Sequence, residues 1–458
     1  MKTTRVPAVL CGIVLGIAAL AEEAMPPAWP MPPGIPMFPP GVRTPDVKQG
    51  EMVLPCQVCK VTVEDAARAP GEPAVLAAVR VAFSPDGRLL AVGTAAGEVR
   101  LVDVYANRER WKAAAVLDAL DTVDFSNDGK SVCVAGSTAE LAVVCLDAET
   151  GAVRWKTAIE PLTAAAAAHL RARLLPLPGG ELLFAAESAS SLSGPLVRLA
   201  ADGSVRWRQP AAPGAGVPLL ASAVTPDGGR ILLLTGGGAE RPDGPFPRNA
   251  FCIVDPASGK VTGKVAVEAV ALQASPQTAP VRPRIAFAGD GTAGCLLLPD
   301  GTLRRFATDK PLELKPVPNA PPRTTGVAVL PGGRLCAVSD DAVTGLGPDD
   351  TRLWSLQDGR CFAGPWASAE GRWVTACATD RAEDNKARPS SGMLLLAPDW
   401  EGEAAAKIAF LYRLEGHVGP VGAMAADGSA FVVVEMGVAK PKAGEASAAP
   451  QIHVHVVR

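Results

Sequence analysis

Two cysteines near the N-terminus have a spacing at which thiols can do chemistry. Cys56 and Cys59 are separated by two residues, and Lys60 follows directly. A Cys-x-x-Cys pair can be a redox dithiol, half of a zinc site or a point of haem attachment. Zinc would need a second pair, which the chain lacks, and redox pairs usually lie on a strand-to-helix unit. We therefore expect a local disulfide that fastens an N-terminal strand, with redox chemistry as the alternative.

Other side chains have the chemistry of metal ligands but not the number or spacing. His453 and His455 are two residues apart, so they share one face of a strand, yet the chain has only four histidines. Asp340-Asp341 and Asp349-Asp350 offer the oxygen ligands that calcium prefers, without the alternating spacing of a calcium-binding loop. The Gly-x-Ser-x-Gly motif of serine hydrolases is absent. We expect no metal, no other cofactor and no preassembled catalytic residues.

These side chains must be positioned by short strands. Between residues 120 and 157, four apolar runs of three to six residues alternate with turns rich in Gly, Asp and Asn. Such runs predict strands rather than helices, and four of them in about forty residues have the size of one propeller blade. The fold class is therefore all-β, a single β-propeller of four-stranded blades.

The number of blades follows from a repeated turn after the first strand of each repeat. It occurs at residues 84–87, 126–129, 177–180, 225–228, 288–291, 330–333, 368–371 and 425–428. Eight turns predict eight blades, and seven is the alternative if the repeat at Ala288 or Ser368 is an inserted hairpin. Arg110-Trp111-Lys112, Arg154-Trp155-Lys156 and Arg206-Trp207-Arg208 close the first three repeats, and we interpret each tryptophan as a wedge between neighbouring sheets.

The repeats resemble two propeller families. Residues 146–155, LDAETGAVRW, are similar to the tryptophan-docking repeat of the quinoprotein-like superfamily, with weaker echoes at Asp255–Lys260 and Gln357–Cys361. Residues 79–104 and 413–434 resemble the WD-repeat family. The resemblance implies a propeller over residues 75–458. Quinone-dependent members carry adjacent cysteines, which this chain lacks, so the departure argues against pyrroloquinoline quinone.

The N-terminal segments differ in composition from the repeats. Residues 1–21 have the basic, apolar and small-residue regions of a cleavable export signal, and residues 22–50 form a Pro-rich tether. Residues 51–74 contain the cysteine pair and a strand, Cys59–Glu64, that could complete the last blade. Cys133, Cys295, Cys336 and Cys377 are expected to be unpaired, buried apolar residues. We expect a secreted or periplasmic monomer without a transmembrane segment in its mature form.

The predicted working surface is the face on which long connections between second and third strands emerge. We expect five of them, at Glu187–Pro195, Gly236–Asn249, Ser339–Asp350, Thr379–Ser391 and Val438–Pro450. Long loops on a rigid scaffold often carry binding residues. The candidate partner-binding residues in these loops are Arg241, Asp243, Arg248, Asp349, Asp350, Arg381, Asp384, Lys386, Arg388, Lys440 and Lys442.

Charge and motifs together favour a binding protein. The formal net charge is -3, and the loops carry both signs, which fits a protein or cell-envelope partner better than nucleic acid. We therefore expect a non-catalytic interaction scaffold. The alternative is an extracytoplasmic enzyme, either a polymer lyase or hydrolase or a redox protein using Cys56 and Cys59.

Overall fold

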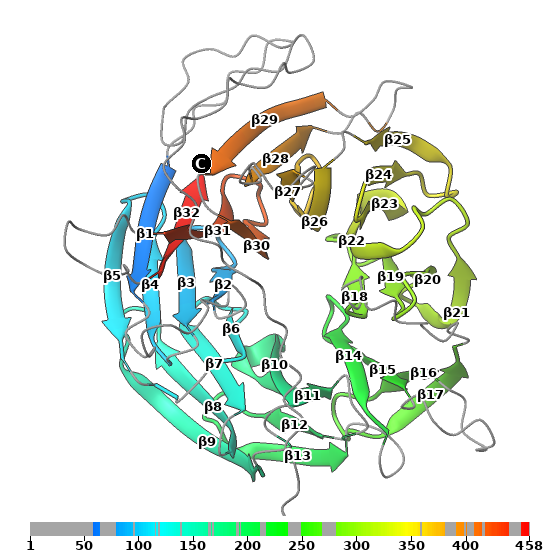
Figure 1. Cartoon of the computed structure of the whole chain (residues 1–458). Coiled ribbons are helices and arrows are strands. Elements are labelled where there is room, and N and C mark those ends of the chain that lie inside the picture. The colour runs from blue at the N-terminus through cyan, green and yellow to red at the C-terminus, as the bar shows by residue number, and fades with distance from the viewer. Residues whose placement is uncertain are drawn as a thin grey trace, which may run out of the picture. The chain divides into compact units, whose positions relative to one another are not determined.

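The described part of the chain is a ring of antiparallel sheets. A computed structural model describes residues 58–64 and 79–457. It leaves out 211–216, 237–248, 268–280, 381–390, 401–406, 439–449 and breaks of one to three residues elsewhere. All described residues belong to one compact unit, Pro36–Arg458, and they form eight four-stranded sheets (Figure 1). The predicted propeller of four-stranded blades is confirmed.

The first four blades follow one another along the chain. Blade 1 contains β2 (Val79–Phe83), β3 (Leu89–Thr94), β4 (Val99–Asp103) and β5 (Arg108–Ala113). Blade 2 contains β6 (Thr122–Phe125), β7 (Ser131–Ser137), β8 (Glu140–Asp147) and β9 (Val153–Pro161). Blade 3 contains β10 (Leu170–Pro176), β11 (Leu182–Ser188), β12 (Pro195–Leu199) and β13 (Val205–Pro210). Blade 4 contains β14 (Leu219–Val224), β15 (Ile231–Gly236), β16 (Asn249–Val254) and β17 (Val261–Ala266).

The other four blades repeat this order. Blade 5 contains β18 (Arg284–Phe287), β19 (Ala293–Leu297), β20 (Leu303–Ala307) and β21 (Lys310–Pro316). Blade 6 contains β22 (Thr324–Leu330), β23 (Arg334–Ser339), β24 (Val343–Leu346) and β25 (Arg352–Leu356). Blade 7 contains β26 (Arg360–Ala367), β27 (Val374–Asp380), β28 (Ser391–Ala397) and β29 (Lys407–Leu414). Blade 8 contains β30 (His417–Met424), β31 (Phe431–Val438) and β32 (Pro450–Val457), with β1 (Val58–Glu64) as its outer strand.

Blade 8 joins the two ends of the propeller. β1 pairs antiparallel with β32 along seven residue pairs, from Val58 opposite Val457 to Glu64 opposite Gln451. The inner strands also meet, because β2 contacts β30 as each other inner strand contacts its neighbours (Figure 1). The sheet edge of β32 is therefore covered, as closed β-architectures require.

Each of the eight turns predicted from the sequence joins the first and second strands of a blade. In blade 1, the Ser84 hydroxyl donates a 2.6 Å hydrogen bond to Asp86 and accepts one from the Leu89 amide. Gly87 has φ 69°, a left-handed conformation that glycine adopts without steric cost. The turns of blades 3 and 6 include the short 3₁₀ segments Pro178–Gly180 and Pro331–Gly333. Pro-Gly-Gly and Ser-Pro-Asp-Gly thus form the turn at the same position of the blade.

Neighbouring blades pack through Val, Leu and Ala side chains, as the low aromatic content requires. The cluster between blades 2 and 3, for example, buries Leu141 and Val143 against Leu174, Leu182 and Phe184. All five have at most 1% of their surface exposed. Burial of this kind contributes about 25 cal/mol per Å² of apolar surface, so the blade interfaces supply much of the fold's stability.

Tryptophan wedges join the first four blades. The indole N–H groups of Trp111, Trp155 and Trp207 donate to the Ala148, Ala201 and Pro256 carbonyls, each in the next blade, at 2.7–3.0 Å. A glycine in the same turn lies under each ring, namely Gly151, Gly203 and Gly259. A Cβ atom there would come within 2.6–2.8 Å of the ring. The predicted wedges are confirmed, and Asp255–Lys260 is one of the turns on which they dock.

Gln357–Cys361, the other weak echo, is not such a turn. It follows β25 directly and includes the first two residues of β26, so it belongs to the connection between two blades and does not join the third and fourth strands of one. The turn in the docking position of blade 6 is at residues 347–351, where Gly347 donates its amide to the Thr351 carbonyl. The similarity at Gln357–Cys361 is local composition without the supporting hairpin.

The expectation that Cys133 is unpaired is wrong. Cys133 on β7 forms a disulfide with Cys145 on β8, where the two residues stand directly opposite each other. The two thiols meet because the register of the β7–β8 pairing places Cys133 opposite Cys145. Cys295, Cys336 and Cys377 are buried and free, as is Cys252. For these three the expectation is confirmed.

Several predictions concern residues outside the described ranges. They include the export signal at 1–21, the tether at 22–50 and Cys56. Cys59 lies on β1 opposite Val456. Because Cys56 is outside the described ranges, the disulfide between Cys56 and Cys59 stays a prediction. Within the part of the chain that the structure describes, no helix is long and apolar enough to cross a membrane.

Candidate functional site

The strand directions separate the two faces of the propeller. The first strand of each blade ends at a repeated turn, the second strand returns, and the connection to the third strand emerges at the opposite face. In blade 3, Leu170 at the start of β10 stands opposite Ser188 at the end of β11. The starts of the inner strands and the second-to-third connections therefore share one face, which we call the connection face.

The strand ends that flank four of the five long connections are on the connection face. These strand ends pair in register, as Gly236 with Asn249 and Thr379 with Ser391 do. Most of the candidate binding residues in the connections lie outside the described ranges: Arg241, Asp243, Arg248, Arg381, Asp384, Lys386, Arg388, Lys440 and Lys442. Their role in binding stays a prediction.

The fifth long connection, Ser339–Asp350, was wrongly predicted. Residues 343–346 within it form β24, a four-residue strand that the sequence pattern Val-Thr-Gly-Leu does not mark clearly. Asp340 and Asp341 remain on the connection face, but Asp349 and Asp350 follow β24 and lie at the opposite face. The two aspartate pairs therefore sit at opposite ends of a strand and cannot bind one calcium ion together.

Asp350 has a structural role between blades 5 and 6. Its carboxylate accepts hydrogen bonds from Arg305 on β20, at 3.0 Å from Nε and 2.5 Å from Nη2. Arg305 also donates to the Gly333 and Gly347 carbonyls, so all three contacts cross from blade 5 to blade 6. The side chains are only 12% and 16% exposed. Asp350 is thus engaged by the scaffold at the face opposite the connection face, and its role in partner binding stays a prediction.

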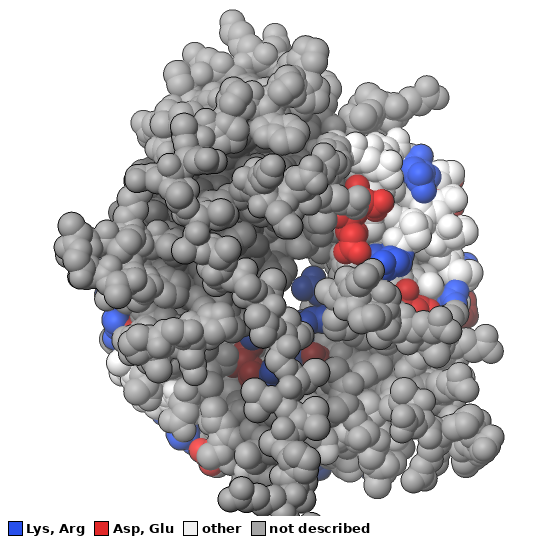
Figure 2. All heavy atoms as spheres, viewed as in Figure 1, with Lys and Arg blue, Asp and Glu red and all other residues white. Residues whose placement is uncertain are grey.

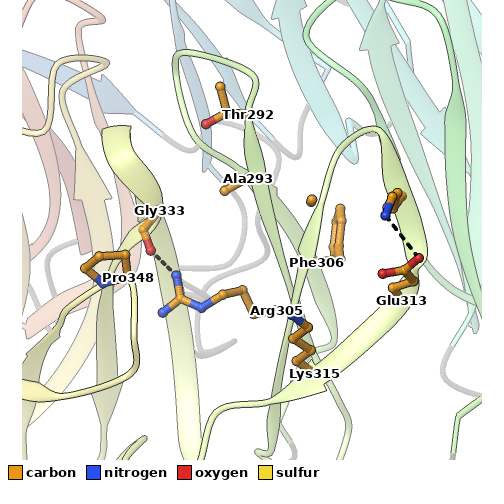
Figure 3. A pocket seen from close by; sticks show the side chains of 10 residues that line it. Thr292, Ala293, Arg305, Phe306, Glu313, Lys315, Gly333 and Pro348 are labelled. Atoms are coloured by element: carbon orange, nitrogen blue, oxygen red, sulfur yellow. Dashed lines mark hydrogen bonds and ion pairs between the residues drawn. The ribbon is translucent and has the colours of Figure 1, made fainter.

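A small pocket lies beside this ion pair. It has a volume of about 210 Å³ and is lined by Arg305, Phe306, Glu313, Lys315 and Pro348, among others. Figure 3 shows the Arg305 guanidinium directed at the Gly333 carbonyl and Glu313 paired with a lysine, Lys310. Its polar groups already contact one another, so the pocket offers few free groups to a ligand.

The central channel brings together charged residues that the sequence places far apart. Alternate residues of the inner strands face the channel, at two and four positions before each repeated turn. Near the turns, a cavity of about 450 Å³ is lined by Ala82, Asp124, Ala286 and Ala328, together with larger apolar residues such as Phe83. Toward the connection face, this lining gives way to arginine.

Five arginines from three alternate blades form a channel cluster. They are Arg80 on β2, Arg171 and Arg173 on β10, Arg284 at the start of β18, and Arg282 two residues before it. Arg80, Arg173 and Arg284 each stand four residues before a repeated turn, and Arg171 and Arg282 stand six before it. Figure 2 shows basic and acidic atoms deep in the opening at the centre of the ring.

The pKa values show that these arginines converge. The pKa of Arg80 is lowered by burial and by the charges of Arg282 and Arg171, although Asp121 opposes the shift. Burial also lowers the pKa of Arg284, and Arg173 and Arg282 add to the effect. For Arg80 the like charges come from two other blades, and for Arg284 they come from another blade and from Arg282 two residues before it. The channel therefore concentrates positive charge.

Three carboxylic acids lie within the cluster, and two of them accept hydrogen bonds from the next blade. Asp121 accepts a 3.0 Å hydrogen bond from the Ala172 amide. Glu187 accepts bonds of 2.9 and 2.7 Å from the amide and hydroxyl of Ser222 and lies 3.8 Å from Arg173. Burial raises the pKa of Glu187 and raises that of Asp124 to about 6. Five arginines against three acids leave an excess of two positive charges when all three are ionised.

Sequence reasoning missed this cluster. The signal available was arginine at a fixed distance before the repeated turn, as in Arg171-Ala-Arg173 and Arg282-Pro-Arg284. Without the ring, arginines 80, 173 and 284 are separated by about a hundred residues each and have no evident relation. The alternation of strand residues and ring closure together place them in one channel.

His453 and His455 both lie on β32, in the last blade. His455 is buried on β32, and the ring centres of His453 and His455 are 6.2 Å apart. Among the described residues, no group of three His, Cys, Asp or Glu side chains is arranged to hold a metal ion.

Comparisons with known proteins place the chain among propellers. Residues 95–292 match the sequence family described as outer membrane protein assembly factor BamB. Among curated proteins, a sequence search finds no match. The C-terminal WD40 domain of Sif2 is 11% identical, with a TM-score of 0.56, over 83% of this chain and 95% of that one. BamB from Moraxella catarrhalis is 14% identical, with a TM-score of 0.52, over 82% and 95%.

A third similar structure is the dihydro-heme d1 dehydrogenase NirN, at 14% identity and a TM-score of 0.50, over 74% of this chain and 67% of that one. At such identities the solved structures inform only about the fold. Together with the docked tryptophans, they define the class. The chain is a β-propeller, and residues 95–292 are similar to the BamB family.

Proposed function

We propose that the protein is an exported, non-catalytic scaffold that captures a protein of the cell envelope on its connection face. The observation that carries this proposal is that the strand ends flanking four long second-to-third connections, at 189–194, 237–248, 381–390 and 439–449, lie on one face of the ring. The corresponding connection in blade 5 needs only residues 298–302. A rigid ring with enlarged loops on one side is a common arrangement for recognition.

Two further observations support this function. The family matching residues 95–292 is described as an outer membrane protein assembly factor, which is a protein-binding role in the cell envelope. The Cys133–Cys145 disulfide fits an oxidising compartment outside the cytoplasm. The predicted export signal at residues 1–21 agrees with both.

The loop of blade 7 provides the test. Replacing residues 381–390 by Asn-Gly, a dipeptide favoured in tight hairpins, should keep the pairing of β27 with β28. We expect the tagged variant to recover at least about tenfold less of the specific partner from a cross-linked envelope extract, a loss typical of removing a binding hot spot. Quantitative mass spectrometry of the captured proteins measures this.

The matched control changes the opposite face. Tyr105 and Glu149 are exposed in turns between third and fourth strands, so Tyr105→Ala/Glu149→Ala should leave capture unchanged. Unaltered capture by the loop variant, with an unchanged melting temperature, would refute the proposal. Equal losses in both variants would do the same.

A further inference from the structure

The arginine cluster of the channel has more donors than the structure uses. Neither Arg282 nor Arg284 makes a hydrogen bond or an ion pair with another described residue, although the charge of Glu187 acts on Arg284. Each guanidinium presents five N–H donors in a fork that matches a carboxylate. Glu187 offsets only part of the repulsion that Arg173 and Arg282 exert on Arg284, so an anionic ligand would relieve the rest.

The spacing of the arginines fits an extended peptide. Arg171 and Arg173 are two residues apart on β10, and Arg282 and Arg284 repeat this on blade 5. Side chains two apart on a strand are separated by about 7 Å along it. An extended peptide lying along the channel has the same interval between alternate side chains. Carboxylates at alternate positions could therefore meet both levels of arginine.

The composition of the channel argues against nucleic acid as the ligand. Sites for single strands combine basic grooves with aromatic residues on which bases stack. At the level of Arg80, Arg173 and Arg284, the intervening blades contribute Thr122, Ala221 and Gly326.

We propose that the channel cluster of Arg80, Arg171, Arg173, Arg282 and Arg284 binds an acidic, extended peptide segment that enters from the connection face. Arg171 and Arg282, nearest that face, receive the first carboxylate. Arg80, Arg173 and Arg284 receive the next one deeper in the channel. The inference rests on the proposed function, because the acidic segment belongs to the partner captured on the same face.

Binding of a defined peptide to the full chain tests the proposal. The probe is a fluorescein-labelled twelve-residue peptide of alternating Glu and Ser, and binding is followed by fluorescence anisotropy. We expect Arg282→Gln/Arg284→Gln to weaken binding at least about tenfold, since two charge-assisted contacts are lost. Removing like charges should not lower the melting temperature. Arg171→Gln, on another blade, provides a second test and should also weaken binding.

The matched control removes the same charge from the outer edge. Arg206 on β13 and Arg352 on β25 are exposed, so Arg206→Gln/Arg352→Gln should change affinity less than about twofold. Equal weakening by the control, or equal affinity for a peptide of alternating Gln and Ser, would overturn the proposal. Tighter binding of oligothymidylate than of the Glu peptide would also overturn it and assign the cluster to nucleic acid.

The two proposals fail separately. The variant lacking residues 381–390 should retain peptide affinity even though it loses capture of the partner. If the channel variant binds the peptide normally while the loop variant loses the partner, the scaffold function stands and the channel inference is wrong. If the loop variant keeps its partner while the channel variant loses the peptide, the reverse holds.

Discussion

At the scale of single residues, the channel keeps a carboxyl group in an environment that disfavours its charge. Asp124 on β6 accepts a 3.0 Å hydrogen bond from the Phe125 amide, but burial dominates and raises its pKa from 3.8 to about 6. Arg173 partly opposes this shift. The same side chain lines the cavity near the repeated turns, so its protonation changes the charge of the channel.

The raised pKa predicts how Asp124 affects stability with pH. Below about pH 3 the carboxyl is protonated in both states and contributes nothing. As pH rises through 3.8 the unfolded chain releases its proton first, so the folded state loses stability up to about pH 6. Above about pH 7 the loss is complete, at most about 3 kcal/mol. Asp124→Asn should therefore be more stable than wild type at pH 7 and equal to it near pH 3, measured by urea unfolding.

Asp128 in the next turn is the matched control. Its carboxylate accepts a 2.6 Å hydrogen bond from the Ser126 hydroxyl, which holds its pKa below the usual value. Such a group stabilises the fold above its unfolded pKa and loses that effect only as pH falls through its lower folded pKa. Asp128→Asn should destabilise by the same amount at pH 7 and pH 5. A constant difference for Asp124→Asn over this range would contradict the assignment.

At the scale of elements, the turns on which tryptophans dock require glycine for two reasons. Gly203 has φ 82°, and a Cβ atom would lie 2.6 Å from two ring carbons of Trp155. Gly179 in the same blade has φ 75° but no neighbouring atom within 4 Å. Gly179→Ala should therefore lower the free energy of unfolding by about 1–2 kcal/mol through backbone conformation alone. Gly203→Ala should lower the free energy of unfolding by about 1–3 kcal/mol more, because its Cβ atom displaces the Trp155 ring.

Thermal or urea unfolding of the two alanine variants measures the difference. Removing the ring with Trp155→Ala should abolish the additional loss at Gly203, because the clash then has no partner. The double variant thus separates backbone strain from docking. Equal destabilisation at Gly179 and Gly203 would mean that the contact with Trp155 contributes nothing.

The elements also show how far the sequence could be interpreted. Turn chemistry is local, so all eight repeated turns and the wedges at Trp111, Trp155 and Trp207 could be predicted. Register is not local. The short strand β24, hidden in an expected loop, and the pairing of Cys133 with Cys145 depend on which residues stand opposite each other. The arginine cluster could not be predicted from turns or register, because its members come together only when the blades close into a ring.

At the scale of the whole molecule, the ring brings segments at opposite ends of the propeller into one blade. β1 and β32 share seven residue pairs, and this pairing covers a strand edge that includes Val454 and Val456. The inner-strand contact between β2 and β30 closes the ring independently of β1. The outer strand therefore protects an edge and ties the ends together, while the inner strands define the channel.

Two truncations test this division. Deleting residues 2–50 leaves β1 in place and should give a folded monomer with the stability of the mature protein. Deleting residues 2–64 removes β1 and exposes the edge of β32, whose apolar strand can then pair with another copy. We expect a lower melting temperature and association that increases with protein concentration, followed by light scattering. Because β2 still meets β30, the shorter chain should retain its affinity for the acidic peptide at low concentration. Loss of that affinity without aggregation would show instead that β1 is needed to hold the inner strands of the channel in position.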